Sequence, residues 1–170
     1  MSPLQTLLRT SRAARPFASC SSAHLHRRTV MTIGKPMYTA HAVARGEGRD
    51  GEVKSDDDAG LTLRLGTPKS LGGQGDGNNP EQLFAMGYAA CLLTAIQLAA
   101  GRLGKTHAAS KAAVYADVNI GDAKEHGDYG LSVDIRVEGI EDQEVIDAGH
   151  KLCPYSRMLE HGAVVNITKK

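Results

Sequence analysis

Apolar and polar residues alternate along several parts of this chain, as they do in half-buried β-strands. Residues 37–43 and 61–65 show this pattern on either side of a glycine-punctuated turn at 46–51. They predict two or three strands of an antiparallel meander. Residues 114–120 and 131–137 alternate in the same way, so we expect a second antiparallel hairpin there.

A long helix is predicted after a glycine-rich loop at residues 66–78. Asn79 is a good N-cap, and Pro80 suits the first helical position because its missing N–H would have no partner there. Gln82 completes a capping box three residues after the cap. The helix is therefore expected to begin near Pro80 and to end around Gly101.

The C-terminal part predicts one more helix and one more strand. Residues 141–152 have helical spacing, with Asp142 as a plausible cap, and residues 163–168 alternate like a closing strand. The expected order is β-β-β-α-β-β-α-β, which is typical of an α+β fold.

Residues 83–100 carry no charge and are long enough to approach the lower limit for a membrane span. However, the segment is rich in alanine and glycine, contains Thr94 and Gln97, and lacks basic or aromatic anchors at its ends. A helix that is apolar on all sides can equally be the buried axis of a folded domain. We expect a buried central helix and no membrane insertion.

Composition changes at the N-terminus. The first 46 residues contain no Asp or Glu, and five arginines fall within the first 30 amid many Ser, Thr and Ala. This composition predicts a mitochondrial transit peptide, with residues 1–34 as presequence and linker, rather than a secretory signal. A disordered basic tail is the plainer alternative. Met31 offers a second start that would give a cytosolic form.

Residues 35–170 are expected to form one domain with its own core. Without the five N-terminal arginines, 15 basic side chains face 19 acidic ones, so the net charge is near −4. This balance argues against a nucleic-acid partner, because such proteins neutralise phosphates with clustered Lys and Arg. Cys91 and Cys153 lack the spacing of a four-cysteine zinc site or a disulfide scaffold.

Several separated motifs resemble the organic hydroperoxide resistance (Ohr) branch of the Ohr/OsmC family, and they occur in the same order from about Lys35 to the C-terminus. They are Gly48-Arg49-Asp50-Gly51, Leu71-Gly72-Gly73-Gln74-Gly75, Asn79-Pro80-Glu81-Gln82-Leu83-Phe84-Ala85, Gly87-Tyr88, Ala90-Cys91 and Cys153-Pro154-Tyr155-Ser156.

The resemblance implies an intertwined homodimer with a long central helix that acts as a thiol peroxidase on organic hydroperoxides. It assigns Cys91 as the peroxidatic cysteine, Cys153 as the resolving one, and Arg49 and Glu81 as completing the site. No cofactor is expected to be bound. The implied reductant is an external dithiol, dihydrolipoamide or a lipoylated enzyme subunit, and such enzymes occupy the mitochondrial matrix.

The chemistry of a peroxidatic cysteine gives a role to each of these four residues. A peroxidatic cysteine reacts as the thiolate, and a buried apolar helix disfavours that charge, so Cys91 needs a positive partner. Arg49 could supply it, with Glu81 orienting the guanidinium. Cys153 would gain from peptide N–H groups if Pro154 opens a helical turn.

The spacing of Glu81 and Cys91 limits this interpretation. Ten residues of helix place them about 15 Å apart along the axis and on different faces. Either the helix breaks near Gly87, or Arg49 meets the two residues in different arrangements, or a second subunit supplies one member. We favour the last.

Four apolar residues could line a pocket that favours alkyl or fatty-acid hydroperoxides over hydrogen peroxide. They are Phe84, Tyr88, Leu92 and Met158. Each of the four can equally be an ordinary core residue. In the same way, Cys91 can be a packed core residue of an apolar helix, and Arg49 a solvated charge in a glycine turn.

Other signals are weak. The glycine-rich loop matches neither phosphate-binding pattern, and His150, Cys153 and His161 form a poor zinc pattern, so we expect no metal. Two functional alternatives remain: a non-enzymatic thiol redox sensor, and an OsmC-type peroxidase with broader peroxide selectivity. Steady-state turnover of an alkyl hydroperoxide with dihydrolipoamide would distinguish a peroxidase from the sensor. Comparing the rates with alkyl hydroperoxide and hydrogen peroxide would distinguish the Ohr type from the OsmC type.

Overall fold

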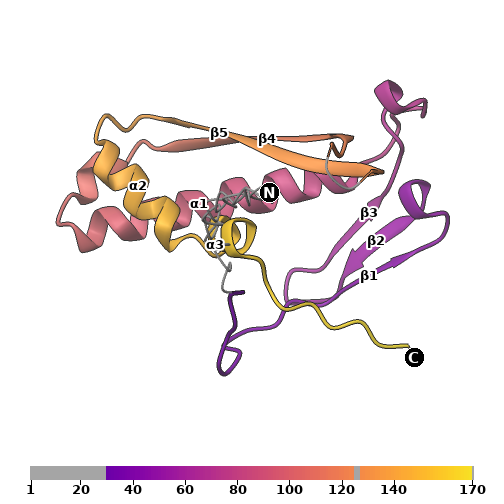
Figure 1. Ribbon diagram of the computed structural model, residues 1–170, viewed down its shortest axis with the longest axis horizontal. Coiled ribbons are helices and arrows are strands. Elements are labelled where there is room, and N and C mark those ends of the chain that lie inside the picture. The colour runs from indigo at the N-terminus through magenta and orange to yellow at the C-terminus, as the bar shows by residue number, and fades with distance from the viewer. Residues whose placement is uncertain (1–29, 125–126, 170) are drawn as a thin grey trace, which may run out of the picture.

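The computed structural model describes residues 30–124 and 127–169 (Figure 1). The predicted presequence falls mainly on residues 1–29, together with Cys20, and therefore lies outside the described residues.

The predicted N-terminal meander is present as a three-stranded antiparallel sheet. It consists of β1 (Ala42–Arg45), β2 (Glu52–Ser55) and β3 (Leu61–Arg64), in that order. The first strand is shorter than predicted, since pairing begins only at Ala42 opposite Ser55. The chain turns away after Ser55, so residues 37–41 have no partner strand to pair with in β2.

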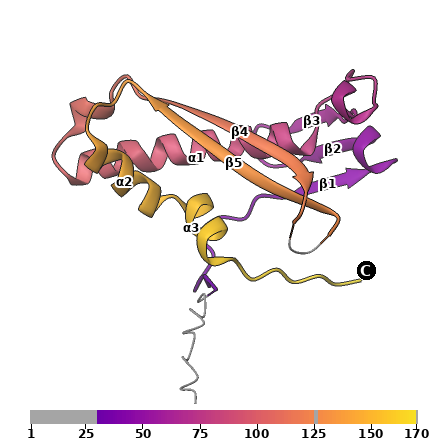
Figure 2. The same ribbon diagram turned by 45° about the horizontal axis from the view of Figure 1, so that its top comes forward.

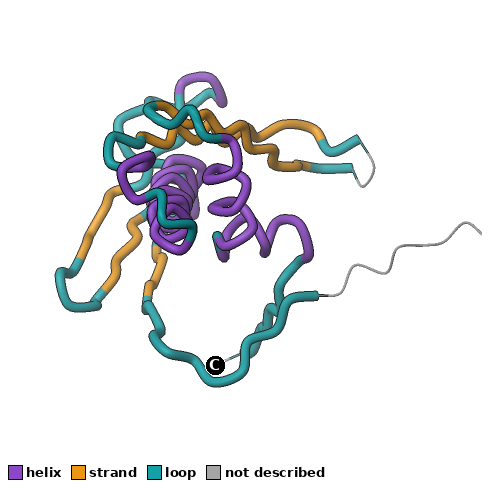
Figure 3. The backbone as a smooth tube through the Cα atoms, turned by 90° about the vertical axis from the view of Figure 1, so that its left-hand side faces the viewer, coloured by secondary structure: helices purple, strands orange, loops and turns teal. Residues whose placement is uncertain are grey.

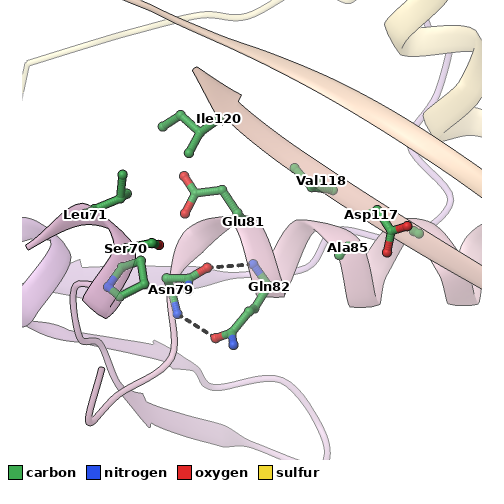
Figure 4. A pocket seen from close by; sticks show the side chains of 11 residues that line it. Ser70, Leu71, Asn79, Glu81, Gln82, Ala85, Asp117, Val118 and Ile120 are labelled. Atoms are coloured by element: carbon green, nitrogen blue, oxygen red, sulfur yellow. Dashed lines mark hydrogen bonds between the residues drawn. The ribbon is translucent and has the colours of Figure 1, made fainter. Parts of the chain in front are cut away.

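The central helix α1 (Pro80–Arg102) confirms the predicted capping box and both predicted ends to within one residue. Asn79 Oδ1 accepts a hydrogen bond from the Gln82 N–H at 2.9 Å, and Gln82 Oε1 accepts one from the Asn79 N–H at 3.0 Å (Figure 4). Two donors at the helix start are thus satisfied reciprocally, which fixes where α1 begins. The helix has no break at Gly87.

The predicted hairpin is formed by β4 (Ala113–Asp122) and β5 (Tyr129–Glu138), which pair over their whole length. The hairpin runs along one side of α1, and the meander lies beyond the N-terminal end of that helix (Figures 1 and 2). Val133, Ile135 and Val137 alternate with polar neighbours and pack against the core, as the period of two predicts.

Two short helices cover another side of α1 (Figure 3). α2 (Gln143–Leu152) is capped by Asp142 as predicted, with the carboxylate accepting from the Glu144 N–H at 3.0 Å. α3 (Pro154–His161) follows after a single residue, Cys153, which ends one helix and caps the next. The buried core joins these helices to α1. Its residues are Tyr88, Leu92, Ala95, Ile96, Ala100, Ala109, Val145 and Cys153.

The predicted closing strand at residues 163–168 is wrong. Within the described residues the segment forms no strand, and only Ala163 makes a single bridge with Met31. The alternation of apolar residues indicated extended backbone, but a strand also needs a neighbour to bond. Val165 and Ile167 are largely exposed, at 78% and 93%. The observed order is β-β-β-α-β-β-α-α, still an α+β fold.

α1 is long and apolar enough to cross a membrane by length and composition alone. In the described part of the chain it packs against β4, α2 and α3, as the central helix of a folded domain does. Its uncovered side presents Met86 and Leu98, which are 64% and 51% exposed. Part of the helix is therefore a core element, and another part is an apolar face open to solvent or to a partner.

Gly149 sets how closely α2 approaches α1. A Cβ placed there would lie 2.4 Å from Ile96 Cγ1 and 2.7 Å from Ile96 Cα. Gly149→Ala is expected to destabilise the protein by about 3 kcal/mol, because backbone cannot yield as a flexible side chain can. Chemical denaturation measures the change. Gly101→Ala, at a helical glycine with nothing within 4 Å, is the matched control and should be neutral or slightly stabilising.

Candidate active site

Cys91 and Cys153 are brought together by α1 and the corner between α2 and α3. Cys91 lies near the middle of α1, and its Sγ is 3.7 Å from the Sγ of Cys153, although 62 residues separate them in sequence. Cys153 is fully buried, whereas Cys91 is partly exposed. Since a disulfide needs about 2.05 Å between the sulfurs, only a small local shift separates the two thiols from bond formation.

The surroundings of Cys91 disfavour its ionisation. Burial is the main cause that raises the pKa of the Cys91 thiol, and the neighbouring Cys153 raises it further. The backbone N–H of Tyr155 acts in the opposite direction. Pro154 is the first residue of α3 and has no N–H, so the amide of Tyr155 is the first that this helix can offer. The predicted helical turn at Pro154 is confirmed.

An aromatic cluster holds α3 in place beside Cys91. The Tyr155 ring stacks on Phe84 at a centroid distance of 6.0 Å and lies 5.9 Å from Tyr88. The Tyr88 and Ser156 hydroxyls share a buried hydrogen bond of 2.9 Å. A Cβ at Gly87 would lie 3.3 Å from the Tyr155 hydroxyl, so the glycine leaves room for this ring. The sequence motif contained Tyr155 and Ser156, but nothing in it revealed these contacts.

Arg49 and Glu81 form an ion pair within the same chain. Arg49 belongs to a short 3₁₀ turn, Gly48–Asp50, and Glu81 lies in the first turn of α1. Nη1 of Arg49 donates to Oε1 of Glu81 at 3.1 Å, and Nη2 donates to Oε2. This two-pronged contact raises the pKa of Arg49 and lowers the pKa of Glu81. Nε of Arg49 is buried and has no partner among the described residues.

The ion pair and the thiol pair occupy different parts of α1. The helix is continuous from Pro80 to Arg102, which rules out a break near Gly87. Glu81 and Cys91 therefore remain about 15 Å apart along the axis. The four site residues that the sequence suggested thus come together as two pairs, and no contact joins the pairs within the described residues of one chain.

Two cavities adjoin the Arg49–Glu81 pair, one lined by Glu81 and the other by Arg49. The larger, about 570 Å³, is lined by Glu81 together with Ala85, Val118 and other residues (Figure 4). The other, about 490 Å³, is lined by Arg49 and Tyr129 among others. Leu71 and Ile120 line both cavities. In the sequence, Ile120 belonged only to the alternating segment 114–120, and Leu71 only to one of the family motifs.

The four residues predicted to line an apolar pocket have different surroundings. Phe84 and Tyr88 line a separate cavity of about 390 Å³ with Leu131, Val133 and others. Leu92 is buried in the core. Met158 lies on α3 and is 36% exposed, and neither residue lines that cavity. In the described part of the chain, no cluster of three or more His, Cys, Asp and Glu could hold a metal ion.

The α+β fold and the contact between Cys91 on α1 and Cys153 at the α2–α3 corner define a two-cysteine domain. Comparisons with known proteins show its family. Residues 73–168 match the OsmC-like protein family. The organic hydroperoxide resistance protein of Xanthomonas axonopodis pv. citri is 40% identical over 140 residues, covering 79% of this chain and 95% of that protein. The chain therefore belongs to the Ohr/OsmC family.

Solved structures agree in fold. The organic hydroperoxide resistance protein of Elizabethkingia anophelis is 38% identical with a TM-score of 0.65, and the match covers 76% of this chain and 94% of that one. OhrB of Bacillus subtilis is 31% identical with a TM-score of 0.64, covering 75% and 95%.

Removing the second thiol should make Cys91 more reactive. Because Cys153 raises the pKa of Cys91, Cys153→Ala is expected to lower that pKa and to increase the thiolate fraction at pH 7. Alkylation of Cys91 by iodoacetamide, located by mass spectrometry, should accelerate several-fold and reach its plateau at lower pH. Cys153→Ser, which nearly preserves the packing, should act in the same direction. An unchanged or slower rate in both variants would contradict this interpretation.

Proposed function

We propose that this protein is a thiol peroxidase that reduces organic hydroperoxides to alcohols. The observation that carries the proposal is the 3.7 Å contact between the sulfur atoms of Cys91 and Cys153. Relatives at up to 40% identity among those compared are named organic hydroperoxide resistance proteins. This name and the adjacent thiols favour peroxide reduction over a purely structural role for the cysteines.

The proposed reaction uses both sulfurs in turn. The Cys91 thiolate attacks the terminal peroxide oxygen, the O–O bond breaks, and the alkoxide leaves as an alcohol after taking up a proton. Cys91 becomes a sulfenic acid. The Cys153 sulfur then displaces the hydroxyl of that acid as water and forms a Cys91–Cys153 disulfide. An external dithiol reduces this disulfide by exchange, returning both thiols.

Arg49 and Glu81 serve this reaction in the proposed homodimer. Within one chain they pair with each other, far along α1 from Cys91, while Nε of Arg49 has no partner among the described residues. We propose that the pair of one subunit faces Cys91 of the other, where the guanidinium would stabilise the thiolate and bind a peroxide oxygen. The exposed apolar side of α1 and the exposed apolar residues Val164, Val165 and Ile167 supply surface for such a subunit contact.

The cavities beside Arg49 and Glu81 favour an organic substrate. Leu71, Val118 and Ile120 contribute apolar surface next to a fixed charge pair. Such a combination suits a hydroperoxide whose alkyl group avoids water while its peroxide group meets the guanidinium. Hydrogen peroxide has no alkyl group and would gain nothing from this surface.

The reductant and location follow from the same proposal. A dihydrolipoyl group, free as dihydrolipoamide or carried by a lipoylated enzyme subunit, is a dithiol suited to the exchange step. The N-terminal composition would direct the chain to the mitochondrial matrix, and translation from Met31 would leave a cytosolic form.

Serine substitutions test the two sulfurs separately. Cys91→Ser is expected to abolish turnover of an alkyl hydroperoxide with dihydrolipoamide, because an alcohol cannot replace the thiolate nucleophile. Cys153→Ser should still consume about one equivalent of peroxide per site but then stop with Cys91 as sulfenic acid. Steady-state and single-turnover kinetics measure these outcomes. Full activity of Cys91→Ser would show that Cys91 is not the nucleophile. Disulfide formation without turnover in the wild-type protein would favour a redox sensor.

Mixed dimers test the shared site. Arg49→Ala and Cys91→Ser chains are each expected to be inactive as homodimers. When they are co-expressed with different tags, a heterodimer would contain one complete site, built from Arg49 of one chain and Cys91 of the other. The random mixture should therefore regain about one quarter of wild-type activity. A heterodimer as inactive as its parents would place Arg49 and Cys91 in the same subunit's site.

A further inference from the structure

Asp50, next to Arg49, links the 3₁₀ turn to the glycine-rich loop. Its Oδ1 accepts a hydrogen bond from the backbone N–H of Thr67 at 2.8 Å, and its Oδ2 accepts one from the Thr67 hydroxyl at 3.1 Å. Both oxygens of the carboxylate are therefore used on one residue. This Asp50–Thr67 link joins two segments that are 17 residues apart.

Thr67 in turn organises the loop that follows it. Its carbonyl oxygen accepts from the Gly75 N–H at 3.0 Å. A Cβ at Gly73 would lie 2.0 Å from the same oxygen, so the loop folds back on Thr67 with no space for a side chain there. Leu71, at the end of the 3₁₀ turn Lys69–Leu71, is carried by this compact unit.

The loop and the turn meet around the ion pair. Arg49 lies one residue before Asp50, whereas Glu81 follows the loop at the start of α1. Leu71 lines both cavities beside the pair. The Asp50–Thr67 link therefore joins the turn that carries the guanidinium to the loop that carries apolar surface of both cavities.

We propose that Asp50 is a positioning residue for the peroxidase reaction: through Thr67 it fixes the place of Arg49 relative to Leu71, and so aligns the charged and the apolar parts of the substrate site. This inference rests on the proposed function, which assigns no role to Asp50. The carboxylate does not touch the reacting atoms in this role. It acts through the Arg49 guanidinium and through the glycine-rich loop.

Among the described residues, the Asp50–Thr67 hydrogen bonds are the ones that join the 3₁₀ turn Gly48–Asp50 to the glycine-rich loop, so they can set the position of one relative to the other. The Leu65 N–H donates to the Gly51 carbonyl at 2.8 Å, and the ion pair with Glu81 holds the arginine itself. Without the link, the turn would keep only these two contacts besides the β1–β2 pairing at its base, and Arg49 could shift relative to the loop. Misplacement of a substrate-positioning group by about 1 Å can cost on the order of a hundredfold in rate.

Four substitutions distinguish the geometric effect of the Asp50–Thr67 link from the effect of the negative charge of Asp50. Asp50→Ala removes the link, and Thr67→Val removes its hydroxyl half. Asp50→Asn removes the charge but can still accept from the Thr67 N–H, and Thr67→Ser keeps the hydroxyl. We expect kcat/KM for an alkyl hydroperoxide to fall about tenfold in Asp50→Ala and about threefold in Thr67→Val, with the two conservative variants within about twofold of wild type.

The ratio of kcat/KM for the alkyl hydroperoxide to that for hydrogen peroxide distinguishes positioning from general damage. This ratio should fall in Asp50→Ala, since Leu71 can contact only the organic group. Hydrogen exchange of residues 66–77 should report the loss of the link directly. Asp58→Ala, an exposed aspartate in the turn between β2 and β3, is the matched control and should alter neither measurement.

The outcomes are distinguishable. Asp50→Ala with faster exchange but unchanged kinetics and ratio would show a link without a role in the reaction and would overturn the inference. Asp50→Asn as impaired as Asp50→Ala would mean that charge matters, which also overturns it. An inactive wild-type protein would contradict the proposed function itself, whereas an active wild type with unaffected Asp50→Ala contradicts this inference alone.

Discussion

The unbroken course of α1 determines where every reactive group of this protein can lie. Its capping box fixes the first residue at Pro80, and its 23 residues continue to Arg102 without a break. Glu81 and Cys91 are consequently held at a constant separation, one near the N-terminal end and the other at the middle. A kinked helix could have gathered thiol, guanidinium and carboxylate in one chain. A continuous one distributes them, and the proposed shared site is the consequence.

The apolar surroundings of Cys91 on α1 raise the pKa of its thiol, and the start of α3 partly offsets this effect. A thiol surrounded by apolar side chains resists losing its proton, and the second thiol adds to that resistance. The first free amide of α3 opposes both effects. The helix that carries this amide is held against α1 by the Phe84–Tyr88–Tyr155 aromatic cluster and by the buried bond between the Tyr88 and Ser156 hydroxyls. Packing of side chains thus influences the ionisation of a sulfur atom that they do not all touch.

Local signals in the sequence were sufficient for much of the fold. The cap at Asn79, the alternation in β4 and β5 and the cap at Asp142 each depend on residues near one another, and each was predicted correctly. The strand predicted at 163–168 failed because pairing depends on a distant partner, about which alternation carries no information. The contact between Cys91 and Cys153 and the pairing of Arg49 with Glu81 are equally non-local. Only resemblance to a family suggested them, and the link from Asp50 to Thr67 had no sequence signal.

Cys153 ends α2 and caps α3, so it is the only residue between two helices that both pack on α1. A bond from this corner to Cys91 would close a loop of 62 residues, which in the chain-entropy account restricts the unfolded state by about 4 kcal/mol. The oxidised protein would then be the more resistant to heat and proteases. In the proposed cycle, the reduced protein that begins each turnover would be the more easily unfolded. The supply of dithiol would then set how long each molecule survives as well as how fast it works.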